Sequence, residues 1–341
     1  MRLARILAAS ALALGLAACG SNDSDSSTDD AAGGDGNFPV TIKHAYGETT
    51  IEKQPERVAT VAWSNQDTAL ALGVVPVGMP KVTYGDDDTD GIHPWVKTKL
   101  DELGGTAPAL YDETDGINFE AVADTEPDLI LAPNSGLSQE EYDKLTAITP
   151  NVVAFPEVAW TTTWRQAIEM SGQALGKSDE ATALIADLEK QIADAVAEYP
   201  QIKGTSAVMS WIDPTDLSKL GFYTSQDTRA AFLNDLGFTT PPSVEKASKG
   251  ADSFFVELSA EQADTLDDAD VFVGYGDEAA LKKVQADDLL GKVPALQRGS
   301  VALLQDNSPL AAAVSPSALS IPWMLPEYAQ LLGDAATKAQ G

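Results

Sequence analysis

The chain has 341 residues, of which 52 are acidic and 22 are basic, so its formal net charge at neutral pH is −30. This charge argues against binding to nucleic acid and against attraction to anionic lipid headgroups, because both are themselves negatively charged. It is compatible with a basic protein partner. Cys19 is the only cysteine, so the rest of the chain can form neither a disulfide nor a thiolate metal site.

The N-terminal residues have the pattern of an export signal. Two early arginines precede an apolar run over Ile6–Leu16, which is shorter than the roughly 20 apolar residues of a transmembrane helix. The run ends in Leu-Ala-Ala-Cys, which resembles the lipobox of bacterial lipoproteins, whose cysteine is lipidated and becomes the first mature residue. We predict a signal peptide over residues 1–18 and a lipid anchor at Cys19. The alternative is an ordinary secreted protein with an unmodified thiol.

Residues 19–37 are predicted to form the lipidated cysteine and a flexible acidic tether. The segment GSNDSDSSTDDAAGGDG contains no large apolar residue. It cannot bury enough surface to offset the entropy of folding, and its acidic residues repel one another. The folded part of the chain is therefore expected to begin at residue 38.

From residue 38 onward, short apolar segments alternate with helical patterns. Most of the apolar segments are rich in valine and bounded by turn residues, as is typical of buried strands in an α/β sheet. Their alternation with helices implies parallel sheets with helical crossovers. We predict strands over Val58–Ala62, Val74–Val77, Asp128–Ala132, Val152–Phe155, Ala207–Ser210, Leu220–Tyr223, Asp270–Gly274 and Val301–Leu304, and helices over Gln66–Leu72, Gln139–Ala147, Asp227–Leu236 and Asp277–Val284.

One helical pattern is longer than the others. It begins at the capping residue Ser178 with two acidic residues behind it, its apolar residues recur at helical spacing, and Pro200 ends it. Some 20 helical residues form a rod of about 30 Å. We predict a stiff connecting helix over residues 178–199, between an N-terminal α/β lobe over 38–177 and a C-terminal α/β lobe over 200–341.

The two lobes contain similar segments. A capping residue stands two places before Glu120 in the first and before Glu261 in the second. Eight or nine residues later, an aspartate opens a predicted strand, Asp128 or Asp270. This internal similarity predicts two structurally related lobes, and both shared ancestry and shared packing rules explain it.

Several stretches resemble the substrate-binding lipoproteins of ABC importers for iron-siderophores, haem and cobalamin, and look typical of their actinobacterial siderophore branch. They are TIKHAYGETTI with PERVATVAWSNQDTALALGVVPVG, then TTWRQAIEMSGQALGK, DTRAAFLNDLGF and ELSAEQADTLDDADVFV. Their order and spacing, together with the lipobox and the tether, carry the resemblance, which extends from residue 38 to the C-terminal helix. It implies a class III periplasmic-binding-protein fold, an α/β fold of two Rossmann-like lobes with mostly parallel sheets joined by one long rigid α-helix.

The resemblance also implies a function. Members of the family capture a ferric siderophore in the cleft between the lobes and deliver it to an ABC permease and its ATPase subunit. A surface carboxylate on each lobe docks on permease arginines, and Glu120 and Glu261 match by position; the alternative is that both only cap helices. The protein is then a monomer with no cofactor of its own, anchored through Cys19 to the outer face of the cytoplasmic membrane. The siderophore supplies the ligands to iron.

Aromatic walls and one or two cationic donors would suit a bulky ferric chelate. Trp63, Trp211 and Tyr275 come just after predicted strands, and the carboxyl ends of parallel strands are where such sheets expose ligand sites. For each aromatic residue, a place in the core or at the rim is the alternative. Further aromatic candidates lie in loops or at strand ends, namely Tyr84, His93, Trp95, Tyr111 and Tyr223.

Arg229 is conspicuous in a chain with so few basic residues. Its guanidinium could donate two hydrogen bonds to hydroxamate, catecholate or carboxylate oxygens. The alternative is an ion pair with Asp227 or Asp216. Lys81 and Lys219 are weaker candidates for the same role.

Other ligands fit the sequence less well. Haem or cobalamin would need only one axial His or Tyr, for which His93 is the candidate, with loop packing as its alternative. A bare metal ion is disfavoured because the chain has only His44, predicted in an N-terminal hairpin, and His93. The acidic run Asp86-Asp87-Asp88 lacks the spacing of an EF-hand.

An exported enzyme is the rival from a different class. The chain has no GxSxG, HExxH or P-loop motif, so we predict that it is not an enzyme. A surface adhesion or structural lipoprotein would need no small-molecule cleft, and the bilobal pattern argues against it.

Overall fold

The computed structural model describes residues 38–249, 251 and 253–341, all of which belong to one compact unit. The predicted signal peptide, the lipid anchor at Cys19 and the tether fall on residues 1–37 and lie outside the described residues. No helix in the described part of the chain is long and apolar enough to cross a membrane.

The first sheet is parallel throughout and has the strand order β5-β4-β3-β6-β7. An antiparallel hairpin of β1 and β2 precedes it in the chain and contains His44, as predicted. The strands are β1 (Val40–His44), β2 (Gly47–Ile51), β3 (Val58–Thr60), β4 (Gly78–Pro80), β5 (Ala109–Tyr111), β6 (Leu129–Leu131) and β7 (Val152–Val153).

The second sheet has the order β10-β9-β8-β11-β12 and is mixed. Strands β8, β11 and β12 are parallel, whereas β9 is antiparallel to both β8 and β10. The connection from β8 to β9 is too short for a crossover, so these strands must run in opposite directions. The strands are β8 (Ala207–Trp211), β9 (Lys219–Tyr223), β10 (Phe255–Ser259), β11 (Val271–Tyr275) and β12 (Val301–Leu304).

Helices connect the strands, and parallel pairings dominate, so the predicted α/β class is confirmed. The α-helices are α1 (Asn65–Ala71), α2 (Pro94–Leu103), α3 (Phe119–Asp124), α4 (Gln139–Ile148), α5 (Trp164–Ala174), α6 (Ser178–Ala197), α7 (Thr228–Asp235), α8 (Pro242–Ser248), α9 (Glu278–Ala286), α10 (Pro294–Arg298), α11 (Pro309–Ala313) and α12 (Ser320–Ala339). Short 3₁₀ helices are η1 (Pro200–Ile202), η2 (Ala260–Leu266) and η3 (Leu290–Lys292).

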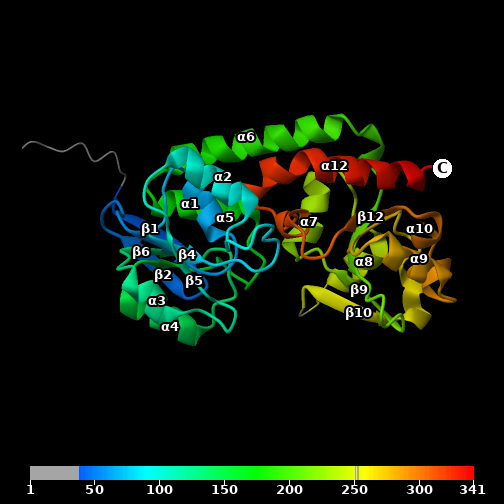
Figure 1. Ribbon diagram of the computed structural model, residues 1–341, viewed down its shortest axis with the longest axis horizontal. Helices are drawn as coiled ribbons and strands as arrows, with labels where there is room; N and C mark the ends of the chain where they lie inside the picture. The colour runs from blue at the N-terminus through cyan, green and yellow to red at the C-terminus, as the bar shows by residue number, and fades with distance from the viewer. Residues whose placement is uncertain (1–37, 250, 252) are drawn as a thin grey trace, which may run out of the picture. The chain divides into compact units, whose positions relative to one another are not determined.

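Helix α6 is the long helix predicted from the sequence, and it lies between the two sheets in chain order. Its buried face includes Leu188 and Ile192. It packs on α5 and runs alongside α12, as Figure 1 shows at the top of the molecule. The helix ends at Ala197, two residues earlier than predicted, because a residue that precedes proline, here Tyr199, avoids the helical conformation.

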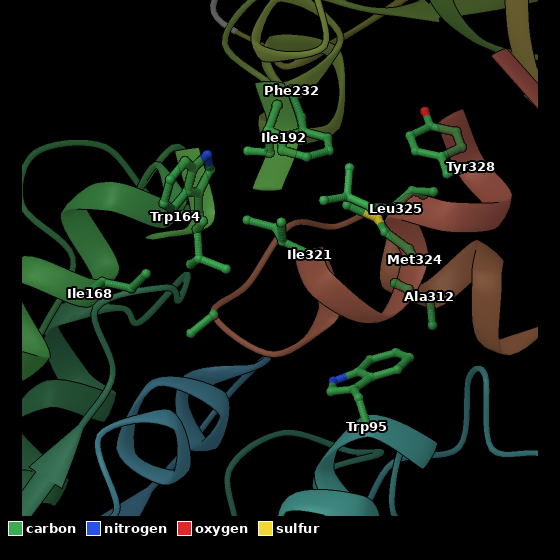
Figure 2. Packing of buried hydrophobic residues seen from close by; sticks show 14 of the residues in the cluster. Trp95, Trp164, Ile168, Ile192, Phe232, Ala312, Ile321, Met324, Leu325 and Tyr328 are labelled. Carbon is green, nitrogen blue, oxygen red and sulfur yellow. The ribbon is translucent and has the colours of Figure 1, made fainter. Parts of the chain in front are cut away.

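The largest hydrophobic cluster draws side chains from both halves of the chain. Figure 2 shows Trp164 of α5 and Ile192 of α6 in the same cluster as Phe232 of α7 and Met324 of α12. Moving the two halves far apart would expose this shared apolar surface to water, which is unfavourable. The core therefore restricts relative motion of the two sheets to small displacements.

The predicted strands agree with the structure within two residues in most cases, but one is misplaced. The sequence predicts a strand over Val74–Val77, whereas the strand that forms is β4, which starts at Gly78. Pro76 has no N–H to donate, so the segment before Gly78 cannot continue the ladder. Val77 still contacts both neighbouring strands: its N–H donates to the carbonyl of Val58 at 2.8 Å, and its carbonyl accepts from the N–H of Ala109 at 3.0 Å.

Candidate ligand-binding site

A cavity of about 500 Å³ opens at the carboxyl ends of parallel strands from both sheets. Residues that follow β3, β4, β6 and β7 line one side of it. The ends of β8 and β11, the loop after β12 and the start of α7 line the other side. Seven of the lining residues are aromatic, namely Trp63, Tyr84, Trp160, Trp211, Tyr223, Phe254 and Tyr275.

The structure brings six of the predicted ligand residues to this one cavity. Three of them line the cavity because the carboxyl ends of the parallel strands meet there. Three more come from a loop, a strand end and a helix start. The six are Trp63, Tyr84, Trp211, Tyr223, Arg229 and Tyr275.

A pair of asparagines holds the first side of the cavity in place. Asn65 accepts a hydrogen bond from the backbone N–H of Asn134 at 2.9 Å and donates to the carbonyl of Asn134 at 2.9 Å. The Asn134 side chain in turn donates to the carbonyl of Trp63 at 3.0 Å. These bonds tie the loop after β3 to the loop after β6, so the backbone of Trp63 is fixed before any ligand arrives.

Two aromatic residues form the end of the second sheet. Trp211 closes β8 and Tyr275 closes the neighbouring parallel strand β11, and their ring centroids lie 5.8 Å apart in a tilted arrangement. The Trp211 side chain is 38% exposed, which leaves much of its indole face without protein contacts. An exposed indole beside a cavity is a surface that an apolar part of a ligand could cover.

Arg229 lies on the cavity wall and is paired with Asp227. Its Nε and Nη2 donate to the two carboxylate oxygens at 2.9 and 2.7 Å, and its Nη1 donates to the hydroxyl of Tyr275 at 3.2 Å. The guanidinium carbon also lies 4.0 Å from the ring centroid of Tyr223. Of the two predicted ion-pair partners, the structure selects Asp227; Asp216 instead accepts hydrogen bonds from Ser218.

Asp227 is fixed by the helix that it begins. It is the N-cap of α7, and its Oδ1 accepts a hydrogen bond from the backbone N–H of Arg229 at 2.9 Å. Burial by itself would lower the pKa of the Arg229 guanidinium, but the Asp227 carboxylate, with Tyr275, raises it above its ordinary value. Three of the five guanidinium N–H groups are used by Asp227 and Tyr275, so two remain for an acceptor in the cavity.

Trp95, another predicted ligand residue, belongs to the core and does not line the cavity. Pro94 begins α2, and Trp95 in its first turn points inward and is 4% exposed. The Trp95 indole N–H donates to Oδ2 of the fully buried Asp67 at 2.8 Å, and the same oxygen accepts from Ser317. A satisfied indole in the core has neither a free face nor a free donor for a ligand.

His93 and Tyr111 are also buried structural residues. His93 stacks on Trp95, its Nε2 is hydrogen-bonded to the carbonyl of Tyr84 at 3.1 Å, and burial lowers its pKa to about 4. Tyr111 donates to the carbonyl of Thr60 at 2.7 Å. The sequence alternative of loop packing is therefore the one that the structure supports for His93, which is not a ligand that a haem in the cavity could use.

The remaining charged candidates lie outside the cavity. Lys219 is exposed at the start of β9 and pairs with Glu257 at 2.7 Å. Lys81 is also exposed and does not line the cavity. In the acidic run, Asp86 accepts hydrogen bonds from the backbone N–H groups of its own loop. Asp88 pairs with Lys97 at 2.5 Å. Such contacts favour a solvated loop.

Two aromatic residues of the cavity, Trp160 and Phe254, were not predicted from the sequence. Both are 44% exposed, and Trp160 adopts a left-handed φ of 63° in the loop after β7. Its indole lies so close to Gly136 that a Cβ at that position would come within 2.0 Å of Nε1. The available signal was a tryptophan a few residues beyond a strand, in the same relation as Trp63 but at a longer distance.

Glu120 and Glu261 occupy equivalent positions in the two halves. Each is exposed and is the second residue of a short helix, α3 or η2, whose N-cap is Asn118 or Ser259. A capping box needs its carboxylate at the third helical residue, so neither glutamate is placed to form one. The helix dipole still favours a carboxylate in the first turn, so the helix-terminal alternative stays open beside the docking role.

The strand-opening aspartates explain much of the similarity between the halves. Asp128 accepts hydrogen bonds from the backbone N–H groups of Glu56 and Arg57, just before β3. Asp270 accepts from the backbone N–H of Ser206 at 2.9 Å, just before β8. In each sheet, a carboxylate thus links the start of one parallel strand to the start of its neighbour.

The two sheets, the helix α6 and the aromatic cavity at the strand ends define a solute-binding protein with two α/β lobes. Residues 58–307 match the family described as periplasmic binding protein, and the chain belongs to this family.

Relatives of known structure resemble the chain over most of its length. PiaA of Streptococcus pneumoniae TIGR4, solved in complex with ferrichrome, is 44% identical with a TM-score of 0.83, covering 87% of this chain and 99% of PiaA. A periplasmic solute-binding protein of Mycobacterium smegmatis is 28% identical with a TM-score of 0.70, covering 87% and 98%. The probable siderophore-binding lipoprotein YfiY of Bacillus subtilis is 29% identical over 259 residues, 75% of this chain and 73% of YfiY.

Proposed function

We propose that this protein captures a ferric siderophore in the aromatic cavity outside the cytoplasm and delivers it to an ABC permease for iron uptake. The observation that carries the proposal is the cavity wall of seven aromatic residues together with the Arg229 guanidinium, of which two N–H groups are not used by Asp227 or Tyr275. The relatives support it, since PiaA was solved with ferrichrome and YfiY is described as siderophore-binding.

The chemistry of the cavity suits a chelate better than a bare metal ion. Its two carboxylates already accept hydrogen bonds, Asp227 from Arg229 and Asp306 from Tyr84. In this proposal the siderophore itself supplies all the ligands to iron. The protein contributes aromatic surface to the organic part of the chelate and Arg229 N–H groups to its oxygen atoms.

The proposal includes the setting in which capture occurs. Lipidation at Cys19 anchors the chain to the outer face of the cytoplasmic membrane, and the monomer requires no cofactor of its own. The permease, with its ATPase subunit, receives the loaded protein through the exposed carboxylates of Glu120 and Glu261. Their equivalent positions on the two halves support this role, because a permease that contacts both lobes can respond when the lobes close around the ligand.

Haem or cobalamin is the alternative ligand, and an exported enzyme is the alternative class. The buried position of His93 removes the histidine that the first alternative would use. The relatives that support the proposal are described as binding proteins, which disfavours the second.

Titration of the protein's intrinsic tryptophan fluorescence tests the proposal, because three tryptophans line the cavity. The ligands are ferric siderophores of several classes, the same siderophores without iron, haem and cobalamin, each corrected for absorption of light by the ligand. Saturable quenching by a ferric siderophore is expected. Quenching by haem or cobalamin alone would mean that the cavity binds that ligand and not a siderophore. A flat response from folded protein would contradict the proposal.

A further inference from the structure

The charged groups of the cavity nearly cancel one another. Among the described residues that line it, Arg229 is the cationic one and Asp227 and Asp306 are the acidic ones, so their formal charges sum to about −1. The Asp227 carboxylate binds one edge of the guanidinium through Nε and Nη2, at 2.9 and 2.7 Å. The side chain of Asp227 is 8% exposed and that of Arg229 is 23% exposed, so water screens the pair weakly.

This pairing changes what Arg229 can do for a ligand. An unpaired buried guanidinium would attract any anion, whereas one already neutralised by a carboxylate offers N–H groups without a net positive charge. Asp227 cannot swing away easily, because its Oδ1 also caps α7 through the N–H of Arg229. The carboxylate is therefore a fixed part of the cavity wall.

Ferric chelates differ strongly in charge. Three singly charged hydroxamates neutralise Fe³⁺, so a ferric tris-hydroxamate carries no net charge, whereas three doubly charged catecholates leave a chelate with three negative charges. The cavity wall, whose formal charges sum to about −1, repels such an anion at short range, and the chain's net charge of −30 repels it at long range. A neutral chelate meets neither penalty and can still accept the remaining Arg229 N–H groups.

We infer that Asp227 is a specificity-determining residue that restricts the cavity to ferric chelates without net negative charge, such as the ferric tris-hydroxamates. The inference rests on the proposed function and narrows it. Asp227 acts through Arg229: it holds the guanidinium in place with two N–H groups left for a ligand, and its charge cancels the attraction of Arg229 for anionic catecholate and carboxylate chelates.

The test is a comparison of two chelates on the wild-type protein and on Asp227→Asn. Asparagine is an equally good N-cap, so the start of α7 is retained while one negative charge is removed. The probes are ferrichrome, a neutral tris-hydroxamate, and ferric enterobactin, an anionic tris-catecholate, each titrated by fluorescence at two salt concentrations. The matched control is Asp216→Asn, which changes the net charge equally at an exposed carboxylate that does not line the cavity.

The wild-type protein is expected to bind ferrichrome at least about a hundredfold more tightly than ferric enterobactin, since like-charge contacts cost several kcal/mol. Asp227→Asn is expected to shift this ratio toward the catecholate by about tenfold or more, and Asp216→Asn by less than about twofold. Binding of neither chelate by folded wild-type protein would defeat the proposed function itself. Equal or preferred binding of the catecholate by wild type, or an equal shift in both variants, would overturn the role of Asp227 alone.

The wild-type comparison requires no variant, so the inference stays testable if Asp227→Asn fails to fold. In that case Asp306→Asn removes the other acidic group of the wall. Its side chain accepts from Tyr84 in an exposed loop, and the same shift toward the catecholate is expected. An unchanged ratio there would count against charge selection by the cavity.

Discussion

The hydroxyl of Tyr84 donates a hydrogen bond of 3.0 Å to Oδ1 of Asp306 and so joins the two sides of the cavity. The next residue, Gly85, donates its backbone N–H to the side chain of Asn307 at 2.9 Å. The loop after β4 therefore contacts the loop after β12 directly. This contact joins the two halves in addition to α6 and the shared core. Ligand capture must occur within the small movement that these contacts allow.

Gly85 is essential for this junction. Its φ is +77°, and a Cβ there would lie 2.4 Å from the Cβ of Ala312. We expect Gly85→Ala to lower the free energy of unfolding by roughly 2–4 kcal/mol through overpacking and backbone strain. Gly104→Ala is the matched control, because Gly104 has a φ of +66° and a Cβ at that position would meet nothing within 4 Å. Denaturant unfolding of both variants measures the difference, and equal losses would show that the junction is not tightly packed.

Trp211 is expected to contribute directly to ligand affinity. Truncation by Trp211→Ala removes an indole whose burial under a ligand is worth roughly 1.5–3 kcal/mol, so the dissociation constant for ferrichrome should rise by about tenfold to a hundredfold. Trp323→Ala is the control, because Trp323 is 37% exposed, nearly the same as Trp211, but does not line the cavity. Calorimetric titration of both variants decides the matter, and a similar loss in the control would place the ligand elsewhere.

Reversal of charge at both Glu120 and Glu261 is expected to abolish iron uptake by cells and to leave the affinity for the ferric siderophore unchanged. Neither residue lines the cavity, and both are exposed where a permease could reach them. The control reverses Asp179 and Glu278, which are equally exposed acidic residues in the first turns of α6 and α9. Uptake that survives in the first pair, or fails equally in the second, would contradict docking through these two carboxylates.

The buried carboxyl of Asp67 is expected to make stability depend on pH. Burial raises its pKa from 3.8 to about 7, against the opposing hydrogen bonds from Ser317 and Trp95. Between these two values the folded protein holds a proton that the unfolded chain releases, so the free energy of unfolding falls as pH rises from about 4 to 7, by at most about 1.4 kcal/mol per pH unit. Glu113, whose pKa burial also raises to about 7, acts in the same direction.

Asp67→Asn removes one of these two contributions. The amide is uncharged at every pH, and its oxygen can still accept from Trp95 or Ser317. Chemical denaturation at half-unit intervals from pH 4 to pH 8 measures the free energy of unfolding. This free energy should fall less steeply with pH in the variant than in the wild type, because only the contribution of Glu113 is retained. Parallel profiles for the two proteins would mean that Asp67 is ionised throughout this range.

The sequence was most informative where position in a sheet decides function. Trp63, Trp211 and Tyr275 could be predicted because a parallel strand fixes which end opens to ligand. Glu120 and Glu261 could be paired because both halves place the same short pattern before a strand. These inferences require only local order along the chain.

The sequence was least informative where side-chain direction or a distant partner decides the outcome. Trp95 resembles the other loop tryptophans in the sequence, and only its bond to Asp67 shows that it faces the core. The selection of Asp227 over Asp216 by Arg229 depends on how the start of α7 turns. Trp160 and Phe254 reach the cavity through loops whose path no periodic pattern describes.

The position of iron in a crystal of the protein grown with ferrichrome tests the central claim most directly, because anomalous scattering locates the metal without reference to the surrounding atoms. We expect the iron inside the cavity, with aromatic rings around the chelate, Arg229 donating to its oxygen atoms, and all iron ligands supplied by the siderophore. Iron outside the cavity, or iron bound directly by a protein side chain, would contradict the account.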